Sequence, residues 1–214
     1  LFNRFKQKRA SNETENNTNE NVNRDKMEDL ILKALRGEIE MDKDKCMEIP
    51  IVARSVNLII NTISNLKVRL YLKEKGNIKE IKDDKRLTLL NISTGDIYSP
   101  NLFRKAVVED YLFYGVGRAY INRNLNNIES IHYVEHSHLS RMWNIDPIFK
   151  NYEIYVDGKR FFNFDFINVY RKMTEHGDGV GVIKENKMAL GLLYTYLKFE
   201  QSLVSSGGNK RGFL

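Results

Sequence analysis

The sequence predicts an α+β fold, in which helices pack on small mixed or antiparallel sheets and hairpins and a long helix lies near the carboxyl end. Three observations indicate this class. In Ile49–Lys73, apolar side chains recur first at helical spacing and then at every second residue. Asp157-Gly158 separates two short alternating segments, which is the strongest hairpin signal in the chain. Lys184–Ser205 carries apolar residues at helical spacing over a long stretch.

The composition is that of a globular protein. A chain of 214 residues fits one domain, or one and a half, and its hydrophobic content of 42% is enough for a core. No run approaches the ~20 apolar residues that a membrane span requires, and the basic amino terminus lacks the apolar segment of a secretory signal. Cys46 is the single cysteine, so no internal disulfide can form, which fits a reducing compartment. We expect no membrane partner.

The net charge of +6 is unevenly distributed. Leu1–Ala10 has four basic residues and no acidic one, whereas Ser11–Glu48 has eleven acidic against six basic residues. The positive excess therefore lies in the first ten residues and from Ile49 onwards. A basic body is compatible with a polyanionic partner such as nucleic acid, and equally with ordinary solubility.

Residues 1–48 are predicted to form a flexible amino-terminal arm with one short helix. Leu1–Arg9 suits a basic amphipathic turn that acts as a docking arm or is frayed. Ser11–Asn23 is rich in Asn, Glu and Thr and has almost nothing to bury, which predicts a disordered linker. Met27–Arg36 has apolar residues at helical spacing and is followed by glycine, which predicts the helix. The charged segment Glu38–Glu48 is expected to be loose.

Residues 49–183 are predicted to form one α+β domain organised around Ile49–Lys73. Pro50 suits the first turn of a helix, where a missing N–H group costs nothing. The apolar stripe that follows consists of Val52, Val56, Ile59, Ile60 and Ile63. From Leu66 to Leu72, apolar residues alternate with more polar ones, which predicts a strand with one buried face. A helix that leads into such a strand must be covered by the remaining elements.

Local signals predict the next elements. Gly76-Asn77 marks a turn in a charged, hairpin-like segment, and Leu87–Ile92 suits a short helix. Ser99-Pro100 supplies an N-cap followed by proline at the first helical position. The helix that begins there is expected to end at Gly115 and Gly117.

Period-two patterns return after Gly117. They predict a hairpin around a turn-rich Asn124–Asn127, a second hairpin around Asp157-Gly158, and two further strands. The predicted strands are Arg118–Asn122, Ile128–Val134, Leu139–Trp143, Tyr152–Val156, Arg160–Phe162 and Phe166–Arg171. His176–Gly181 has three glycines in six residues and is expected to be a flexible loop or a hinge before the last helix.

Residues 184–214 are predicted to form the long helix and the start of a following region. The helix Lys184–Ser205 is apolar on two sides and therefore needs two partners. One partner belongs to a neighbouring subunit, or both belong to the same domain; the pattern fits either arrangement. In the first case the expected subunit-interface residues are Leu193, Tyr196 and Phe199. Lys210 and Arg211 near the end of the chain are the candidate DNA-contacting residues, because paired cations suit phosphates.

Histidines provide the best metal candidate. His132, His136 and His138 with Glu135 could supply several zinc ligands, but a fourth ligand is not evident, and a polar sheet edge explains the cluster more simply. We therefore predict no metal site and keep the three histidines as weak candidates.

No other pattern indicates catalysis or a cofactor. Gly177–Gly181 resembles a glycine-rich phosphate loop, but its glycine spacing before the helix is wrong and no Gly-Lys-Ser/Thr follows. Cys46 and the pair Ser205-Ser206 lack an identifiable base. The residues alone thus predict a mildly basic α+β domain with no visible active site, and we expect no cofactor.

Several segments occur in an informative order. Thr62–Tyr71 reads Thr-Ile-Ser-Asn-Leu-Lys-Val-Arg-Leu-Tyr at the end of a helix that opens with Ile-Pro. Leu89–Asn91 is Leu-Leu-Asn, and Leu112–Tyr120 ends in Gly-Val-Gly-Arg-Ala-Tyr. Ser206–Leu214 reads Ser-Gly-Gly-Asn-Lys-Arg-Gly-Phe-Leu. In this order they resemble the amino-terminal half of the HK-type tailed-bacteriophage portal proteins.

The resemblance has further matches and some departures. Val169–Arg171 is similar to the family's His-Ile-Arg strand end, and Gly177–Ile183 to its Asp-Gly-x-x-Gly-x-Ser-Pro segment. Lys67 replaces a proline of the family pattern, Val182-Ile183 replaces Ser-Pro, and the proline of the Pro-Asn loop is absent. These departures affect loop geometry and not chemistry, because portal proteins have no active site.

The resemblance implies a wing-like α+β domain of a ring-forming homo-oligomer, the head-tail connector, with twelve copies expected for the full-length protein. Such a ring sits at one vertex of the capsid of a bacteriophage or prophage, and double-stranded DNA is packaged and ejected through it. Its partners are terminase, capsid and head-completion proteins. The protein is expected in the virion and, during assembly, in the cytoplasm of the bacterial host. Stem helices, clip and crown would follow Leu214, so we expect the chain to be a fragment.

Two alternatives remain. The first is a stand-alone adaptor derived from a portal wing, which would act as a protein-binding module. The second is a metal-dependent enzyme of nucleic-acid processing that uses the histidine cluster.

Overall fold

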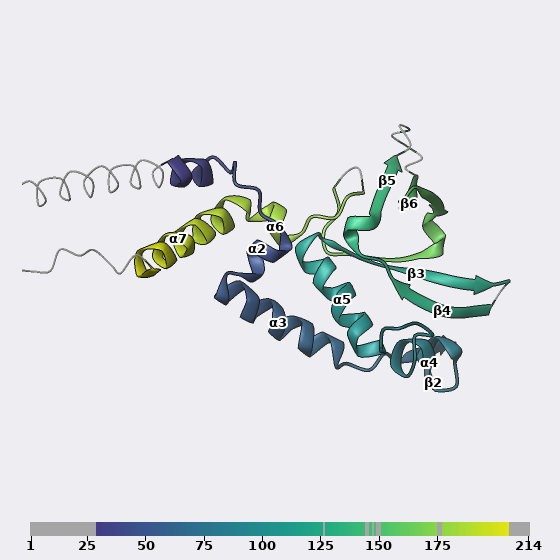
Figure 1. The fold of residues 1–214 in the computed structure, drawn as a ribbon. Helices are drawn as coiled ribbons and strands as arrows, with labels where there is room; N and C mark the ends of the chain where they lie inside the picture. Colours follow the sequence, from purple (N-terminus) through teal and green to yellow (C-terminus); the bar gives the residue numbers. More distant parts are fainter. Residues whose placement is uncertain are drawn as a thin grey trace, which may run out of the picture. The chain divides into compact units, whose positions relative to one another are not determined.

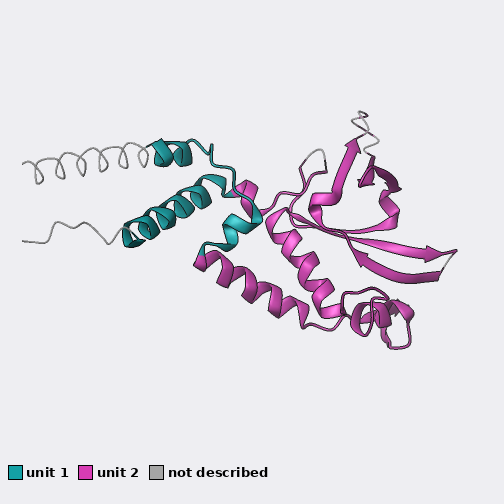
Figure 2. Cartoon of the chain, viewed as in Figure 1, with its two compact units in different colours: residues 1–49, 186–214 teal, residues 50–185 magenta. Residues whose placement is uncertain are grey.

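The computed structural model describes residues 29–125, 127–143, 146, 148, 151–174 and 177–205. The chain divides into two compact units, residues 1–49 with 186–214 and residues 50–185 (Figure 2). The described elements are helices and small antiparallel sheets, so the predicted α+β class is confirmed. The predicted arm begins with residues 1–28, which lie outside the described residues, as do the candidate DNA-contacting residues Lys210 and Arg211.

The first unit is helical in its described part. Residues 29–35 are helical, and α2 (Lys43–Met47) follows within the segment that was expected to be loose. The Asp42 carboxylate caps α2 by accepting from the Lys45 backbone N–H at 2.8 Å, which explains why this charged segment forms a helix. α2 contacts α7 (Lys187–Ser205), and the Lys198 Nζ lies 2.7 Å from a Glu48 carboxylate oxygen.

The second unit begins with α3 (Pro50–Ser64), which confirms the predicted helix and its proline at the first turn. Val56, Ile60 and Ser64 are buried, and α3 contacts α5 (Pro100–Phe113). Figure 1 shows these two helices next to the shorter elements that follow α3. Ile59 and Ile63 of the predicted apolar stripe are each 40% exposed, so the stripe packs on α5 only in part.

Polar side chains hold the chain that leaves α3. The Arg104 guanidinium of α5 donates to the Ser64 carbonyl at 2.9 Å and to the Leu90 carbonyl at 2.5 Å. Asn91, the last residue of α4 (Lys85–Asn91), accepts from the Val68 N–H and donates to the Val68 carbonyl, at 2.9 and 3.0 Å. The side-chain amide of Asn91 thus makes the two backbone hydrogen bonds at Val68 that a neighbouring strand would otherwise make.

The predicted strand with one buried face is wrong in extent and in burial. The strand β1 begins at Leu70 and ends at Glu74, and it pairs only with β2 (Asn77–Ile81). Leu72 is 42% exposed, and most side chains of this hairpin are exposed. Alternation did not produce burial because the hairpin forms a separate two-stranded sheet instead of joining the larger ones.

The main core lies between helices and a three-stranded antiparallel sheet in the order β4-β3-β8. Leu89 of α4 and Phe103 of α5 pack with Ala119 and Ile131 of the sheet. Both ends of α5 follow the prediction, because Ser99 caps its start and Gly115, at φ +82°, follows its end. The sheet strands are β3 (Val116–Asn124), β4 (Asn127–Tyr133) and β8 (Phe166–Tyr170).

A second three-stranded antiparallel sheet has the order β5-β6-β7. Its Asp157-Gly158 turn has positive φ at both residues, as a type I′ hairpin requires, which confirms the prediction. Short 3-10 turns precede β5 and β8. These elements are η1 (His136–His138), β5 (Leu139–Trp143), β6 (Tyr152–Val156), β7 (Lys159–Phe162) and η2 (Asn163–Asp165).

The glycine-rich loop packs closely against the end of α5. A Cβ atom on Gly181 would overlap the Phe113 carbonyl, and one on Gly115 would overlap the backbone of Val180. The Gly115 carbonyl accepts from the Arg171 N–H at 2.9 Å. These glycines therefore allow two backbone segments to pass within contact distance, where the sequence suggested flexibility.

The predicted helix Lys184–Ser205 is present in two parts. Val182–Glu185 forms the short helix α6, and α7 begins at Lys187. Glu185 accepts from both Arg171 and Lys172, at 2.6 and 2.5 Å, which joins α6 to the end of β8. Across the described residues, every helix is too short or too polar to cross a membrane.

We expect Gly181→Ala to destabilise the second unit by about 2–3 kcal/mol, because the added methyl group would displace the backbone of Phe113. Urea denaturation followed by the fluorescence of Trp143, the single tryptophan, measures the change. Gly158→Ala is the control, since Gly158 has a positive φ but open space around it, and it should cost only about 1 kcal/mol. A loss for Gly181→Ala no larger than that of the control would contradict the close packing.

Candidate functional site

The three histidines of the predicted cluster have separate partners. The His132 Nε2 atom lies 2.7 Å from the Ser130 hydroxyl, and its Nδ1 atom lies 3.2 Å from an Asp96 carboxylate oxygen. The His138 Nδ1 atom lies 2.9 Å from Asp157, and this hydrogen bond raises the pKa of His138. His136 instead stacks on the ring of Tyr114, with 4.2 Å between ring centroids.

The structure does not assemble these histidines around a common point. Within the part of the chain that it describes, no group of three or more His, Cys, Asp or Glu side chains is placed to hold a metal ion. Each imidazole is instead committed to a local contact. The signal in the sequence was their spacing alone, and the structure places His132 in β4 but His136 and His138 in the 3-10 turn η1.

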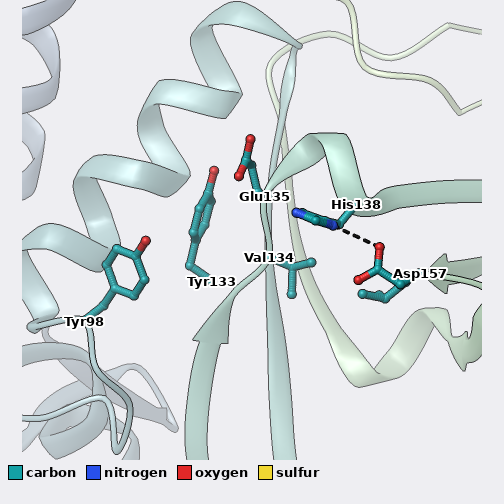
Figure 3. Close-up of a pocket in the computed structure, with 7 residues that line it drawn as sticks. Tyr98, Tyr133, Val134, Glu135, His138 and Asp157 are labelled. Atoms are coloured by element: carbon teal, nitrogen blue, oxygen red, sulfur yellow. Dashed lines mark hydrogen bonds and ion pairs between the residues drawn. The ribbon is translucent and has the colours of Figure 1, made fainter.

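An open pocket of about 300 Å³ lies at the end of β4 (Figure 3). Tyr98 and Tyr133 form one wall, with their rings edge to face at 5.9 Å, and the His138–Asp157 pair forms the other. The Tyr133 hydroxyl donates to the Asp110 carboxylate at 2.8 Å, and burial raises the pKa of Tyr133 so that the phenol stays protonated. The lining residues are Tyr98, Tyr133, Val134, Glu135, His138, Val156 and Asp157.

The pocket has no catalytic arrangement among its lining side chains. None of the seven is a serine, threonine, cysteine or lysine, so the His138–Asp157 pair has no nucleophile beside it there. Its carboxylates and phenols suit hydrogen-bond donors or a cationic side chain.

A polar cluster joins the two three-stranded sheets. The Tyr152 hydroxyl of β6 and the Tyr170 hydroxyl of β8 lie 2.6 Å apart. Arg141 of β5 donates to the Gly177 carbonyl at 3.0 Å and forms an ion pair with Asp178. Its guanidinium also lies over the Trp143 ring, 4.9 Å from the centroid.

Two buried atoms of this region lack hydrogen-bond partners. They are the Nη2 atom of Arg118, a residue of β3 that is only 2% exposed, and the Nδ1 atom of His136. Burial, with the nearby charges of Arg118 and Arg141, lowers the pKa of His136 to about 4. We did not predict a role for either arginine from the sequence, because an arginine at a strand position normally marks the solvent face.

The predicted interface residues of α7 are exposed in the first unit. Leu193 is 44%, Tyr196 is 55% and Phe199 is 37% exposed. The buried residues of the same helix are Leu190, Gly191 and Thr195, which lie on the opposite side. α7 therefore presents an apolar row, Leu193, Tyr196 and Phe199, that the described part of its own unit leaves exposed.

Comparison with known proteins gives one family. A family model described as phage portal protein matches residues 50–214. No curated protein sequence matches the chain.

Solved structures match the fold. The neck of an empty gene transfer agent particle has a TM-score of 0.60 and 15% identity over 82% of this chain and 52% of the other. The virion of a native gene transfer agent gives a TM-score of 0.56 and 15% identity, over 82% and 51%. An HK97 family phage portal protein from Corynebacterium diphtheriae has a TM-score of 0.47 and 16% identity, over 78% of this chain and 50% of the other. The chain thus spans about half the length of the structures that it matches.

The depressed pKa of His136 predicts lower stability in acid. The unfolded histidine titrates near its ordinary 6.5 and the folded one near 4, so between these values the unfolded state binds more protons. Stability present above about pH 6.5 should fall, by no more than about 3 kcal/mol, as the pH drops towards 4. Urea denaturation at several pH values measures this slope.

His136→Phe keeps a ring on Tyr114 and should flatten the slope, whereas His138→Phe should not, because the pKa of His138 is shifted the other way. A slope that His136→Phe leaves unchanged would show that other groups control the acid sensitivity.

Proposed function

Because the chain belongs to the phage portal protein family, we propose that it is part of a subunit that forms a ring at the capsid vertex, through which double-stranded DNA is packaged and ejected. The observation that carries this proposal is the match of the family model to residues 50–214, which includes the whole second unit. The role is structural, with no catalytic residue, cofactor or metal assigned.

The matched particles support the proposed location. One solved structure is a particle neck and another is a virion, and both share the fold of this chain at TM-scores above 0.5. We place the protein at the capsid vertex in the virion and in the bacterial host cytoplasm during assembly. Its partners are terminase, capsid and head-completion proteins, with twelve copies in the ring of the full-length protein. Lys210 and Arg211 stay candidates for contact with DNA.

The apolar row of α7 is the proposed subunit interface. Three large side chains, each more than a third exposed, follow one another at spacings of three residues. Removing each of these side chains from water on assembly would stabilise the ring by about 1 kcal/mol. Because a ring repeats this contact in every subunit, it gains the same stabilisation at each subunit interface.

The proposal predicts rings for a portal protein that contains this whole chain. Electron microscopy of the purified full-length protein should show closed rings with a central channel. In the virus that encodes it, loss of the gene should leave heads without packaged DNA. Monomers at all concentrations, together with normal packaging in the absence of the gene, would refute the proposed function.

Introducing a charge into the apolar row should impair ring assembly. In the full-length protein, Leu193→Lys or Phe199→Lys would place an ammonium group at the buried contact, and each should shift the assembly midpoint at least tenfold towards higher protein concentration. Analytical ultracentrifugation measures the fraction in rings. Gln201→Lys adds the same charge on another side of α7 and should assemble normally. Equal assembly of all three variants would place the interface elsewhere.

A further inference from the structure

Two arginines lie on the facing surfaces of the two three-stranded sheets. In the β4-β3-β8 sheet, Arg118 is paired with Asn168 in register and is on the same face as Tyr170. In the β5-β6-β7 sheet, Arg141 is on the same face as Tyr152. The Tyr152–Tyr170 contact at 2.6 Å joins these two faces. The arginines therefore approach the same junction from opposite sides.

The junction has an excess of positive charge. Arg141 is paired with Asp178, but the interaction that the described structure gives Arg118 is a hydrogen bond from Nε to the neutral Asn168 amide oxygen, at 3.1 Å. Arg118 is 2% exposed, so solvent does little to screen its charge. A buried guanidinium without a countercharge costs several kcal/mol. Among the residues of the junction that the structure describes, the two arginines and one carboxylate leave one positive charge uncompensated.

The junction also has buried nitrogen atoms that lack a hydrogen-bond partner. The Arg118 Nη2 atom is buried and has no acceptor. In the Tyr152–Tyr170 pair one hydroxyl donates to the other, which leaves one O–H group that still needs an acceptor. The buried His136 nitrogen is also without a partner, and as an N–H group it would add a third donor. A group that accepts hydrogen bonds and carries one negative charge would satisfy the Arg118 Nη2 atom and neutralise its charge.

We propose that Arg118 and the Tyr152–Tyr170 junction bind one small monovalent inorganic anion, of the size and charge of chloride or nitrate. The anion accepts from the Arg118 Nη2 atom, neutralises the uncompensated charge and locks the second sheet on the first. The enclosure of Arg118 favours a small ion over a phosphate or an organic acid. A water molecule could accept the same hydrogen bonds but would leave the charge in place.

Thermal unfolding of the full chain in different salts tests the site. Increasing sodium chloride or sodium nitrate, exchanged for sodium gluconate at constant ionic strength, should raise the Tm by about 3 °C or more along a saturating one-site curve. Gluconate, a much larger organic anion, serves as the reference. The same Tm in all three salts would overturn the proposal.

Charge variants show where the anion binds. Arg118→Gln should abolish the difference between chloride and gluconate, while Arg123→Gln, which removes an exposed arginine of the same strand, should keep it. Asp178→Asn removes the negative charge of the junction and should lower the chloride concentration at half-saturation at least threefold. If Arg118→Gln does not fold, Asp178→Asn alone tests the proposed anion site. An unchanged half-saturation in Asp178→Asn, or an unchanged salt effect in Arg118→Gln, would refute the assignment.

Discussion

Close backbone packing at the end of α5 is the constraint on which the second unit depends. Gly115 turns the chain from the helix into β3 with a positive φ, and Gly181 lies against the carbonyl of Phe113. The same turn accepts a hydrogen bond from Arg171 at the end of β8. Helix, central strand, edge strand and the loop before α6 therefore meet where no side chain fits between them. The position of each element follows from this contact.

The polar junction between the sheets follows from the same constraint. β3 starts directly after Gly115, so the turn sets the direction of Arg118, and the loop that packs on the turn carries Asp178. The Arg118 guanidinium is thereby held away from solvent, whereas the Asp178 side chain stays 42% exposed. An arrangement of this kind is costly unless its donors and charge are satisfied, which connects the core of the fold to the proposed anion.

Surfaces rather than a catalytic cleft account for the proposed role. The pocket at the end of β4 is lined by phenols, carboxylates and a histidine pair without a nucleophile. The apolar row on α7 is exposed, whereas the buried residues of this helix are Leu190, Gly191 and Thr195. A subunit of a ring needs such surfaces, because its stability in the assembly comes from contacts that the isolated chain leaves open.

The sequence by itself determined the elements whose signals are local. Ser99-Pro100, Gly115 and Asp157-Gly158 set caps and turns through their own backbone preferences, and the order of the segments indicated the portal family. Tertiary structure alone decided which of these elements became buried. The alternation from Leu66 to Leu72 ended in an exposed hairpin, and Arg118, for which the sequence predicted no role, is only 2% exposed. Whether an element is buried depends on which distant segments pack against it. A residue pattern shows only which side of the element would face such a partner.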